Sequence, residues 1–148
     1  MRPTLDEYFI KVAEVVSSRA ACLRKQYGCV LVKDKYIVST GYNAPPVGEP
    51  HCEICTKSCE TKDEAAYSGC PSSHAEMNAL LLASKEEMQG ATLYLAGFDV
   101  RTGTWISAKP CEICLRLIKN AGVARVVNKD GLLYERGADN LLVEVKDD

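Results

Sequence analysis

The sequence predicts an α/β domain in which helices cover both faces of one sheet. A hairpin pattern near the N-terminus is followed by strand and helix patterns in alternation, and each helix pattern has one apolar face. The 148 residues are the length of one ordinary domain, and 47% hydrophobic and 26% charged residues are typical of a globular protein. No linker or repeat divides the sequence, so residues 1–148 are expected to form a single domain.

The N-terminal half begins with a helix and a hairpin. Residues 4–7 form a capping box, and apolar residues recur at helical spacing to about residue 19. The β-rich residues 29–32 and 36–39 flank a short turn, which predicts a hairpin. Residues 48–73 have no periodicity. This segment contains a histidine and four cysteines, and such a long loop needs its own source of order.

The C-terminal half alternates helices and strands. A second helix is expected from residue 73 to about residue 90, then a strand at 91–98 and a partner strand at 104–107. Pro110 suits the first position of a third helix, which Gly122 would end. Further strands are expected at 123–128 and 141–145.

Composition excludes several classes of function. Eighteen basic and 20 acidic residues give a formal net charge of −2 and a pI near 5.7, which is a poor basis for binding a nucleic-acid backbone. No apolar run approaches the roughly 18 residues of a membrane span, and Asp6 and Glu7 lie where a signal peptide needs an apolar core. We expect a cytosolic protein whose cysteines bind metal or take part in chemistry.

Four residues carry the predicted chemistry: His74, Glu76, Cys111 and Cys114. The two cysteines stand at the start of the third predicted helix, where the helix dipole favours thiolates, and the histidine stands at the start of the second. Two thiolates and one imidazole are the ligands of a catalytic zinc site that keeps its fourth position for water. Zinc would lower the pKa of that water from about 15.7 toward about 7.

Each half of this pattern also has a simpler interpretation. Residues 73–76 match a capping box, in which Glu76 would only cap the helix. A lone C-x-x-C pair is more often a structural zinc or redox motif. The two halves together, with Pro110 directly before Cys111, favour the catalytic interpretation.

A second cysteine cluster lies mainly in the aperiodic segment. C-x-x-C is the usual chelating pair, and one tetrahedral ion can order a loop that has no core. We therefore predict a second, structural zinc bound by Cys22, Cys52, Cys55 and Cys70. Cys59 or His51 could replace one of these ligands, and unliganded thiols are the alternative. Cys29 alternates with valines in a strand and is expected to be a core residue.

The motifs together resemble the cytidine and deoxycytidylate deaminase family, and most specifically its deoxycytidylate deaminases. H-x-E followed by P-C-x-x-C is the signature of zinc deaminases that act on nucleobases. The likeness covers about residues 5–127 and rests on the segments 22–24, 28–32, 41–43, 74–79 and 110–114.

This resemblance implies a three-layer domain with a mixed five-stranded sheet flanked by helices. It assigns proton transfer to Glu76 and substrate binding to Asn43, which would contact the sugar or base, and Ala75. Arg24 is a candidate phosphate contact, with an exposed solubilising arginine as the alternative. Members of the family often assemble as dimers or hexamers, so a homo-oligomer is expected.

Three features depart from the family pattern. Ala44 follows Gly-Tyr-Asn where a glycine is usual, so the resemblance does not extend to regulation by a triphosphate at that loop. Residues 96–109 lengthen the connection before Pro110, enough for an extra hairpin at the rim of the pocket. The tail after Val127 has no aromatic pattern that would place partners for the phosphate.

The leading hypothesis is zinc-dependent hydrolytic deamination of a free cytosine nucleotide, dCMP to dUMP and ammonia. The same core serves deaminases of cytidine, guanine, tRNA adenosine and a riboflavin precursor. A polynucleotide substrate would need a basic, aromatic-bearing groove, and the riboflavin-pathway enzymes normally add a reductase domain. A zinc-stabilised binding module without activity is the remaining alternative. Glu76 argues against it, because an inactive protein would be free to lose that residue.

Overall fold

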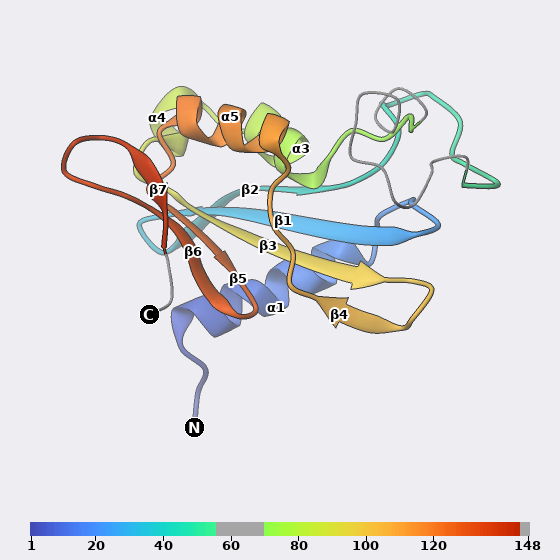
Figure 1. Ribbon diagram of the computed structural model, residues 1–148, viewed down its shortest axis with the longest axis horizontal. Helices are drawn as coiled ribbons and strands as arrows, with labels where there is room; N and C mark the ends of the chain where they lie inside the picture. Colours follow the sequence, from blue (N-terminus) through green and yellow to red (C-terminus); the bar gives the residue numbers. More distant parts are fainter. Residues whose placement is uncertain (56–69, 146–148) are drawn as a thin grey trace.

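The computed structural model describes residues 1–55 and 70–145, and these fold into one mixed sheet with helices on both faces (Figure 1). The sheet has seven strands in the order β2-β1-β3-β5-β6-β7, with β4 paired to β3. Only β3 and β5 pair in parallel. The predicted three-layer α/β architecture is confirmed. The sheet has seven strands rather than the five that the resemblance implied: residues 104–106, 131–136 and 142–144 form three strands beside the four at 25–33, 36–42, 92–99 and 125–128.

One face of the sheet is covered by α1 (Leu5–Ser17). The predicted capping box is present: Glu7 N–H donates to Thr4 Oγ1 over 3.1 Å, and Thr4 N–H donates to Glu7 Oε1 over 2.9 Å. The buried side of α1, which includes Phe9 and Ala13, packs on strand residues such as Val30. Burial of this apolar stripe holds the helix against the sheet.

The central strands β1 (Lys25–Lys33), β2 (Tyr36–Tyr42) and β3 (Thr92–Asp99) separate the two cores. Side chains alternate along β1, so that Val30 packs with α1 while Cys29 and Leu31 pack in the core under the other helices. Cys29 is fully buried, which confirms its predicted core role.

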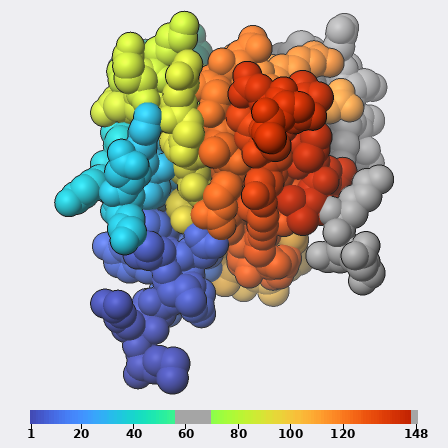
Figure 2. All heavy atoms as spheres, turned by 90° about the vertical axis from the view of Figure 1, so that its left-hand side faces the viewer, coloured from blue at the N-terminus to red at the C-terminus, as the bar shows by residue number. Residues whose placement is uncertain are grey.

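The other face is covered by α3 (Ala75–Leu81), α4 (Lys85–Met88) and α5 (Glu112–Ala121). The sequence predicted one helix over residues 73–90, and this was wrong. Ser84 is a new N-cap, because its hydroxyl accepts from Glu87 N–H over 3.1 Å while Glu87 Oε1 accepts from Ser84 N–H over 2.8 Å. Lys33 Nζ donates to Glu86 O over 2.6 Å and ties α4 to the β1–β2 turn, at the end of the molecule seen in Figure 2.

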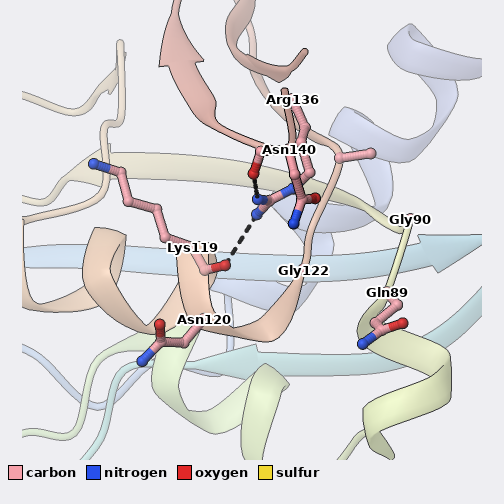
Figure 3. A pocket seen from close by; sticks show the side chains of 8 residues that line it. Gln89, Gly90, Lys119, Asn120, Gly122, Arg136 and Asn140 are labelled. Atoms are coloured by element: carbon pink, nitrogen blue, oxygen red, sulfur yellow. Dashed lines mark hydrogen bonds between the residues drawn. The ribbon is translucent and has the colours of Figure 1, made fainter. Parts of the chain in front are cut away.

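The third predicted helix, α5, begins at Glu112, two residues later than expected. Cys111 is its N-cap, so Pro110 precedes the cap and is not the first helical residue. Gly122 ends the helix with φ 82°, as predicted. Arg136 braces this end by donating to the carbonyl of Lys119 over 3.0 Å and to that of Asn140 over 2.6 Å (Figure 3). A cavity of about 410 Å³ lies beside these residues, at the end of α5 opposite Cys111.

The remaining strands are β4 (Thr104–Ile106), β5 (Arg125–Asn128), β6 (Gly131–Arg136) and β7 (Leu142–Glu144). The hairpin of β3 and β4 was predicted, and so were β5 and β7. Strand β6 was missed, because most of its residues are partly exposed and do not alternate between buried and exposed positions. No helix among the described residues has the length and apolar character needed to cross a membrane.

A glycine lets α3 approach the sheet closely. A Cβ atom on Gly41 of β2 would overlap the carbonyl oxygen of Ala75 and the amide nitrogen of Ala79. The first turns of α3 therefore rest directly on the β2 backbone. This contact fixes the height of α3 above the sheet, and with it the start of the helix.

Candidate metal centre

Three metal-ligating side chains meet where α3 and α5 begin. His74 Nδ1 lies 3.5 Å from Cys111 Sγ and 3.3 Å from Cys114 Sγ. The three ligand atoms all lie within 4.8 Å of one another. The structure thus brings together the three residues that the sequence singled out as ligands of a catalytic zinc.

The distances between these atoms suit a tetrahedral zinc ion. Zinc binds cysteine sulfur at about 2.3 Å and histidine nitrogen at about 2.0 to 2.1 Å, and a tetrahedral angle then separates sulfur from nitrogen by about 3.5 Å. The observed separations are 3.3 and 3.5 Å. Three protein ligands leave one coordination position for a small molecule, which is the arrangement of a catalytic site.

Both helix starts are shaped to present these ligands. Cys111 is the N-cap of α5, and its sulfur accepts a hydrogen bond from Cys114 N–H at 3.4 Å. His74 is the N-cap of α3, and its side chain makes no capping hydrogen bond, which leaves the ring for the metal. Unpaired amides at a helix N-terminus favour negatively charged ligands, so the position suits thiolates.

The two sulfurs differ in their affinity for protons. A hydrogen bond from the Cys114 thiol, helped by His74, lowers the pKa of Cys111 to about 3 against the opposing effect of burial. The same bond to Cys111, together with burial, raises the pKa of Cys114. A bound cation would favour the thiolate form of both sulfurs.

Glu76 lies beside the three ligands, on the first turn of α3, and is 5% exposed. Burial raises the pKa of its carboxyl, against the opposing effects of a hydrogen bond from its own backbone and of the His74 charge. A carboxyl that gains and loses a proton nearer neutral pH is suited to proton transfer.

The capping-box interpretation of Glu76 is wrong. It required Ser73 as the N-cap, but α3 is preceded by His74 in that position. Ser73 instead exchanges backbone hydrogen bonds with Ala44, at 2.8 and 3.2 Å. Glu76 is therefore free of the capping role that offered a purely structural explanation.

Two predicted substrate contacts lie close to this centre. Asn43 is buried, and its side chain accepts from Tyr27 N–H at 2.7 Å and donates to Lys25 O at 2.9 Å. An amide side chain has further donor and acceptor capacity, so these bonds leave room for a ligand. Ala75 is fully buried at the first position of α3. Their contacts with substrate stay predictions.

Arg24 is half-buried and lies just before β1. Its carbonyl accepts a hydrogen bond from Val100 N–H at 3.0 Å, which brings the β3–β4 turn next to it. The extra hairpin of residues 96–109 therefore adjoins the predicted phosphate contact. The phosphate role of Arg24 stays a prediction.

The second cysteine cluster is less closely assembled. Cys22 Sγ accepts hydrogen bonds from Arg24 N–H at 3.4 Å and Lys25 N–H at 3.5 Å. Burial, and then the neighbouring sulfurs of Cys70, Cys22 and Cys55, raise the pKa of Cys52. Within residues 1–55 and 70–145, however, only the first centre brings three ligand atoms within 4.8 Å. His51 is exposed, and Cys59 lies outside the described residues.

Sequence reasoning missed a residue that positions Cys111. Asn128, at the end of β5, is 2% exposed, and its side chain donates to Ala108 O at 2.8 Å and to Ser107 Oγ at 3.1 Å. These bonds fix the segment that leads into α5. The only signal in the sequence was an asparagine directly after two strand valines.

The three-ligand centre, the buried Glu76 and the fold together define a class of protein. It is a metal-dependent hydrolytic enzyme with one open centre, built at two helix starts on a three-layer α/β domain. Residues 3–129 match the family described as the cytidine and deoxycytidylate deaminase zinc-binding region. The chain belongs to this family, as the resemblance implied, and is a zinc-binding deaminase.

Relatives within the family carry a more specific name. The deoxycytidylate deaminase of Mycobacterium phage D29 is 37% identical over 132 residues, which are 85% of this chain and 94% of the relative. The deoxycytidylate deaminase of Saccharomyces cerevisiae is 35% identical, and the alignment covers 86% of this chain but 38% of the yeast protein. The chain thus spans the phage relative and about two fifths of the yeast one.

A solved structure shares the fold. The dCMP deaminase of cyanophage S-TIM5, in complex with dCMP and dUMP, is similar with a TM-score of 0.61 and 26% identity. The similarity covers 86% of this chain and 82% of the cyanophage chain.

Proposed function

We propose that this chain hydrolyses dCMP to dUMP and ammonia with one zinc ion at the centre formed by His74, Cys111 and Cys114. The observation that carries the proposal is the open three-ligand centre with the buried Glu76 beside it. The choice of dCMP is supported by the phage relative, which is matched over 94% of its length, and by the cyanophage structure.

Each residue of the centre has a separate role in this reaction. A zinc ion would supply the Lewis acidity that makes water nucleophilic at neutral pH. Glu76 accepts the proton that the water loses, and it delivers protons to the ring nitrogen and to the departing amino group. One water is consumed, and one ammonia is released. Burial of Glu76 keeps its carboxyl away from bulk solvent during these transfers.

Three other residues are proposed to hold the nucleotide. Asn43 and Ala75 lie at the end of β2 and the start of α3, beside the metal ligands, and are assigned to the sugar and base. Arg24 is assigned to the phosphate, since a guanidinium forms charge-assisted hydrogen bonds with phosphate oxygens. One or two such cations are enough for a mononucleotide.

A panel of substrates tests the proposed function. Purified protein loaded with zinc is offered dCMP, deoxycytidine, CMP, guanine and tRNA, and ammonia release is measured. We expect the highest kcat/KM for dCMP. Equal use of dCMP and deoxycytidine would overturn the nucleotide assignment, and preferential release from tRNA would overturn the choice of a small substrate.

We also propose a second, structural zinc at Cys22, Cys52, Cys55 and Cys70. Two features support it: the amide bonds to the Cys22 sulfur, and the nearness of the other three sulfurs to Cys52, whose pKa they help to raise. Amide donors to sulfur stabilise thiolates, as zinc ligation requires. Metal analysis of protein purified without chelator should then approach two equivalents per chain. One equivalent, unchanged by Cys52→Ser, would overturn this assignment.

The outer face of α5 supports the proposal that the chain assembles with copies of itself. Ile113 and Leu117 lie one turn apart and are 42% and 43% exposed. An antiparallel α5 from a second copy would place these two residues against each other, a self-complementary pairing. Light scattering should give an oligomer that Leu117→Glu dissociates. A monomeric wild-type protein would contradict the proposal.

Residues 1–148 are proposed to act as a single domain in the cytosol, on a free nucleotide and without a nucleic-acid partner. No disulfide joins two of the described cysteines, which suits a reducing compartment. Fractionation of cells that make the protein, followed by detection in the soluble or the membrane pellet fraction, tests this location.

A further inference from the structure

Tyr27 lies on the same face of the sheet as the metal centre. Side chains alternate along β1, and those of Tyr27, Cys29 and Leu31 all contribute to the core beneath α3 and α5. Tyr27 is the member of this row nearest the N-terminal end of β1. Its backbone N–H donates to Asn43 Oδ1 at 2.7 Å, so the strand is fixed to a proposed substrate contact at this position.

Neighbouring strands hold the aromatic ring in place. Tyr27 pairs with Gly97 of β3, and Gly97 pairs with Ile106 of β4. A Cβ atom on Gly97 would lie 2.8 Å from Tyr27 Cε1 and 3.0 Å from Ile106 Cγ1. The ring therefore lies across the space that Gly97 leaves open and against the extra hairpin. A ring packed in this way has little freedom to turn its hydroxyl elsewhere.

The hydroxyl has a different environment from the ring. It makes no hydrogen bond to any residue within 1–55 or 70–145, and it is not among the buried side-chain atoms that lack a partner there. At least part of its surface is therefore exposed to solvent. Burial of the ring, and then the charge of Glu76, raise the pKa of Tyr27 to about 12. The phenol is neutral at physiological pH and keeps a proton to donate.

The hydroxyl is near enough to both ends of the proposed nucleotide site to be affected by their charges. Its electrostatic neighbours are Glu76 at the reacting end, Arg24 at the phosphate end, and Cys22 and Asp99, and the effect of Glu76 is the largest of the four. A fixed aromatic ring with an accessible hydroxyl is a common way to bind a ligand that has both an apolar and a polar side.

We propose that Tyr27 is a substrate-binding residue whose hydroxyl forms a hydrogen bond with the nucleoside part of the nucleotide, and whose ring, backed by Ile106, forms one wall of the pocket. The proposal rests on the proposed function and adds a contact to it. It gives the extra hairpin a role, because β4 supports the ring from the side away from β1.

Tyr27→Phe tests the hydroxyl while it keeps the ring. One neutral hydrogen bond corresponds to a loss of about 2- to 10-fold in kcat/KM. Because the nucleoside is common to both substrates, the loss should be equal for dCMP and deoxycytidine. Arg24→Ala should instead affect dCMP alone. The affinity for the product dUMP, measured by calorimetry, should fall by a similar factor in Tyr27→Phe.

Tyr36→Phe is the matched control. Tyr36 is 76% exposed on β2, and the substitution removes a tyrosine hydroxyl at another place on the sheet. We expect it to change neither kinetics nor dUMP affinity. The thermal midpoint and zinc content of Tyr27→Phe should equal those of the wild type, since no hydrogen bond within the described residues is lost. Unchanged kinetics in Tyr27→Phe, or a loss confined to dCMP, would overturn the proposal.

Failure of this proposal can be told apart from failure of the proposed function. If wild-type protein releases no ammonia from dCMP, the proposed function fails. The kcat/KM of Tyr27→Phe is then divided by that of the wild type, with both measured on the best substrate of the panel. A ratio near one on that substrate overturns the role of Tyr27, and a ratio of about 0.1 to 0.5 supports it.

Discussion

The two groups of metal-ligating side chains are built on different kinds of local structure. His74 and Cys111 are the N-caps of α3 and α5, and Cys114 lies in the first turn of α5. The second group, Cys22, Cys52, Cys55 and Cys70, lies on segments that belong to no helix or strand. The first group brings its ligand atoms within 4.8 Å, and no comparably close set forms in the described part of the second.

This difference shows what backbone order contributes to a metal site. Helix starts are fixed by capping and by packing on the sheet, whether or not an ion is bound. Their ligands are therefore in place before the metal arrives. Ligands on irregular segments lack that support, so the binding free energy of the ion must also order the chain. The first site should be specialised for chemistry and the second for stability.

Loss of a ligand in the first group should have the largest effect on activity. Cys114→Ser replaces a fully buried sulfur. We expect ammonia release to fall to background and the catalytic zinc to be lost, while the ion of the second group is kept. Metal analysis by mass spectrometry gives the number of ions per chain. A normal metal content in both Cys114→Ser and Cys111→Ser would show that these sulfurs are not ligands.

Glu76→Gln should separate proton transfer from metal binding. The amide keeps the shape of the side chain but cannot accept the proton, so kcat should fall by about 10²- to 10⁴-fold. Both zinc ions should remain, because Glu76 is not assigned as a ligand. Near-wild-type turnover would refute the assigned mechanism.

Arg24→Ala tests a residue that lies beside the second group but is assigned to substrate. Charge-assisted hydrogen bonds contribute on the order of 1.5 to 3 kcal/mol, so kcat/KM for dCMP should fall roughly 10- to 150-fold. Deoxycytidine should be much less affected, and the zinc content should not change. If both substrates lose activity equally, the arginine does not act on the phosphate.

Cys52→Ser should produce the opposite pattern to Cys114→Ser. Loss of the second ion should lower stability and leave chemistry nearly intact in the folded protein. A loss of about 2 kcal/mol would lower the thermal midpoint by roughly 4 to 8 °C. Calorimetry and metal analysis of the same sample measure both quantities. An unchanged midpoint with two ions still bound would remove Cys52 from the ligand set.

Asp6→Asn should change neither group of metal ligands, and its effect on stability should be the smallest of these predictions. Asp6 accepts from Arg125 Nη2 at 2.8 Å and from the Tyr94 hydroxyl at 2.6 Å, and so joins α1 to β5 and β3. Because Asp6 and Arg125 are 43% and 36% exposed, screening limits the ion pair to about 0.5 kcal/mol.

The pH dependence of this bond has a defined sign. Burial opposes ionisation of Asp6, but the bonds from Arg125 and Tyr94 outweigh it and lower the pKa of the carboxyl from its usual 3.8. The stabilisation should be present above about pH 4 and be lost as the pH falls through the lowered pKa. Urea unfolding of wild type and Asp6→Asn at several pH values measures the difference. A difference that grows toward low pH would contradict this account.

The sequence predicted the first group well because its spacing encodes local structure. Cys111 is fixed by the hydrogen bond from Cys114 N–H, and the His74 backbone by the first turn of α3, where Asn78 N–H donates to its carbonyl, so each motif determines the geometry of its own half. Convergence of the two halves follows once both helices cover the same face of the sheet. The second group depends on contacts between segments far apart in the sequence, which no local pattern specifies.

Other differences from the sequence prediction have local or tertiary causes. The break between α3 and α4 depends on Ser84 forming a new cap within an apolar helical pattern. Strand β6 is held by pairing with β5 and β7, and its own residues give little signal. The hydroxyl of Tyr27 is placed by Gly97 and Ile106, which are remote from it along the chain. The break at Ser84 is a local capping box within an apolar pattern, whereas β6 and the Tyr27 hydroxyl are placed by tertiary contacts that outweigh local preference.

The close packing of α3 on Gly41 limits which sequences can carry this centre. Gly41 has no side chain with which to bind a metal or a substrate. Any larger residue at this position would nevertheless overlap the backbone of α3 at Ala75 and Ala79. The helix would have to rise from the sheet and carry His74 and Glu76 with it, while Cys111 and Cys114 stayed behind on α5. Substitutions at Gly41 are therefore limited by the need to keep α3 and α5 in position relative to each other. A library that varied only the ligands and the glutamate would not test this requirement.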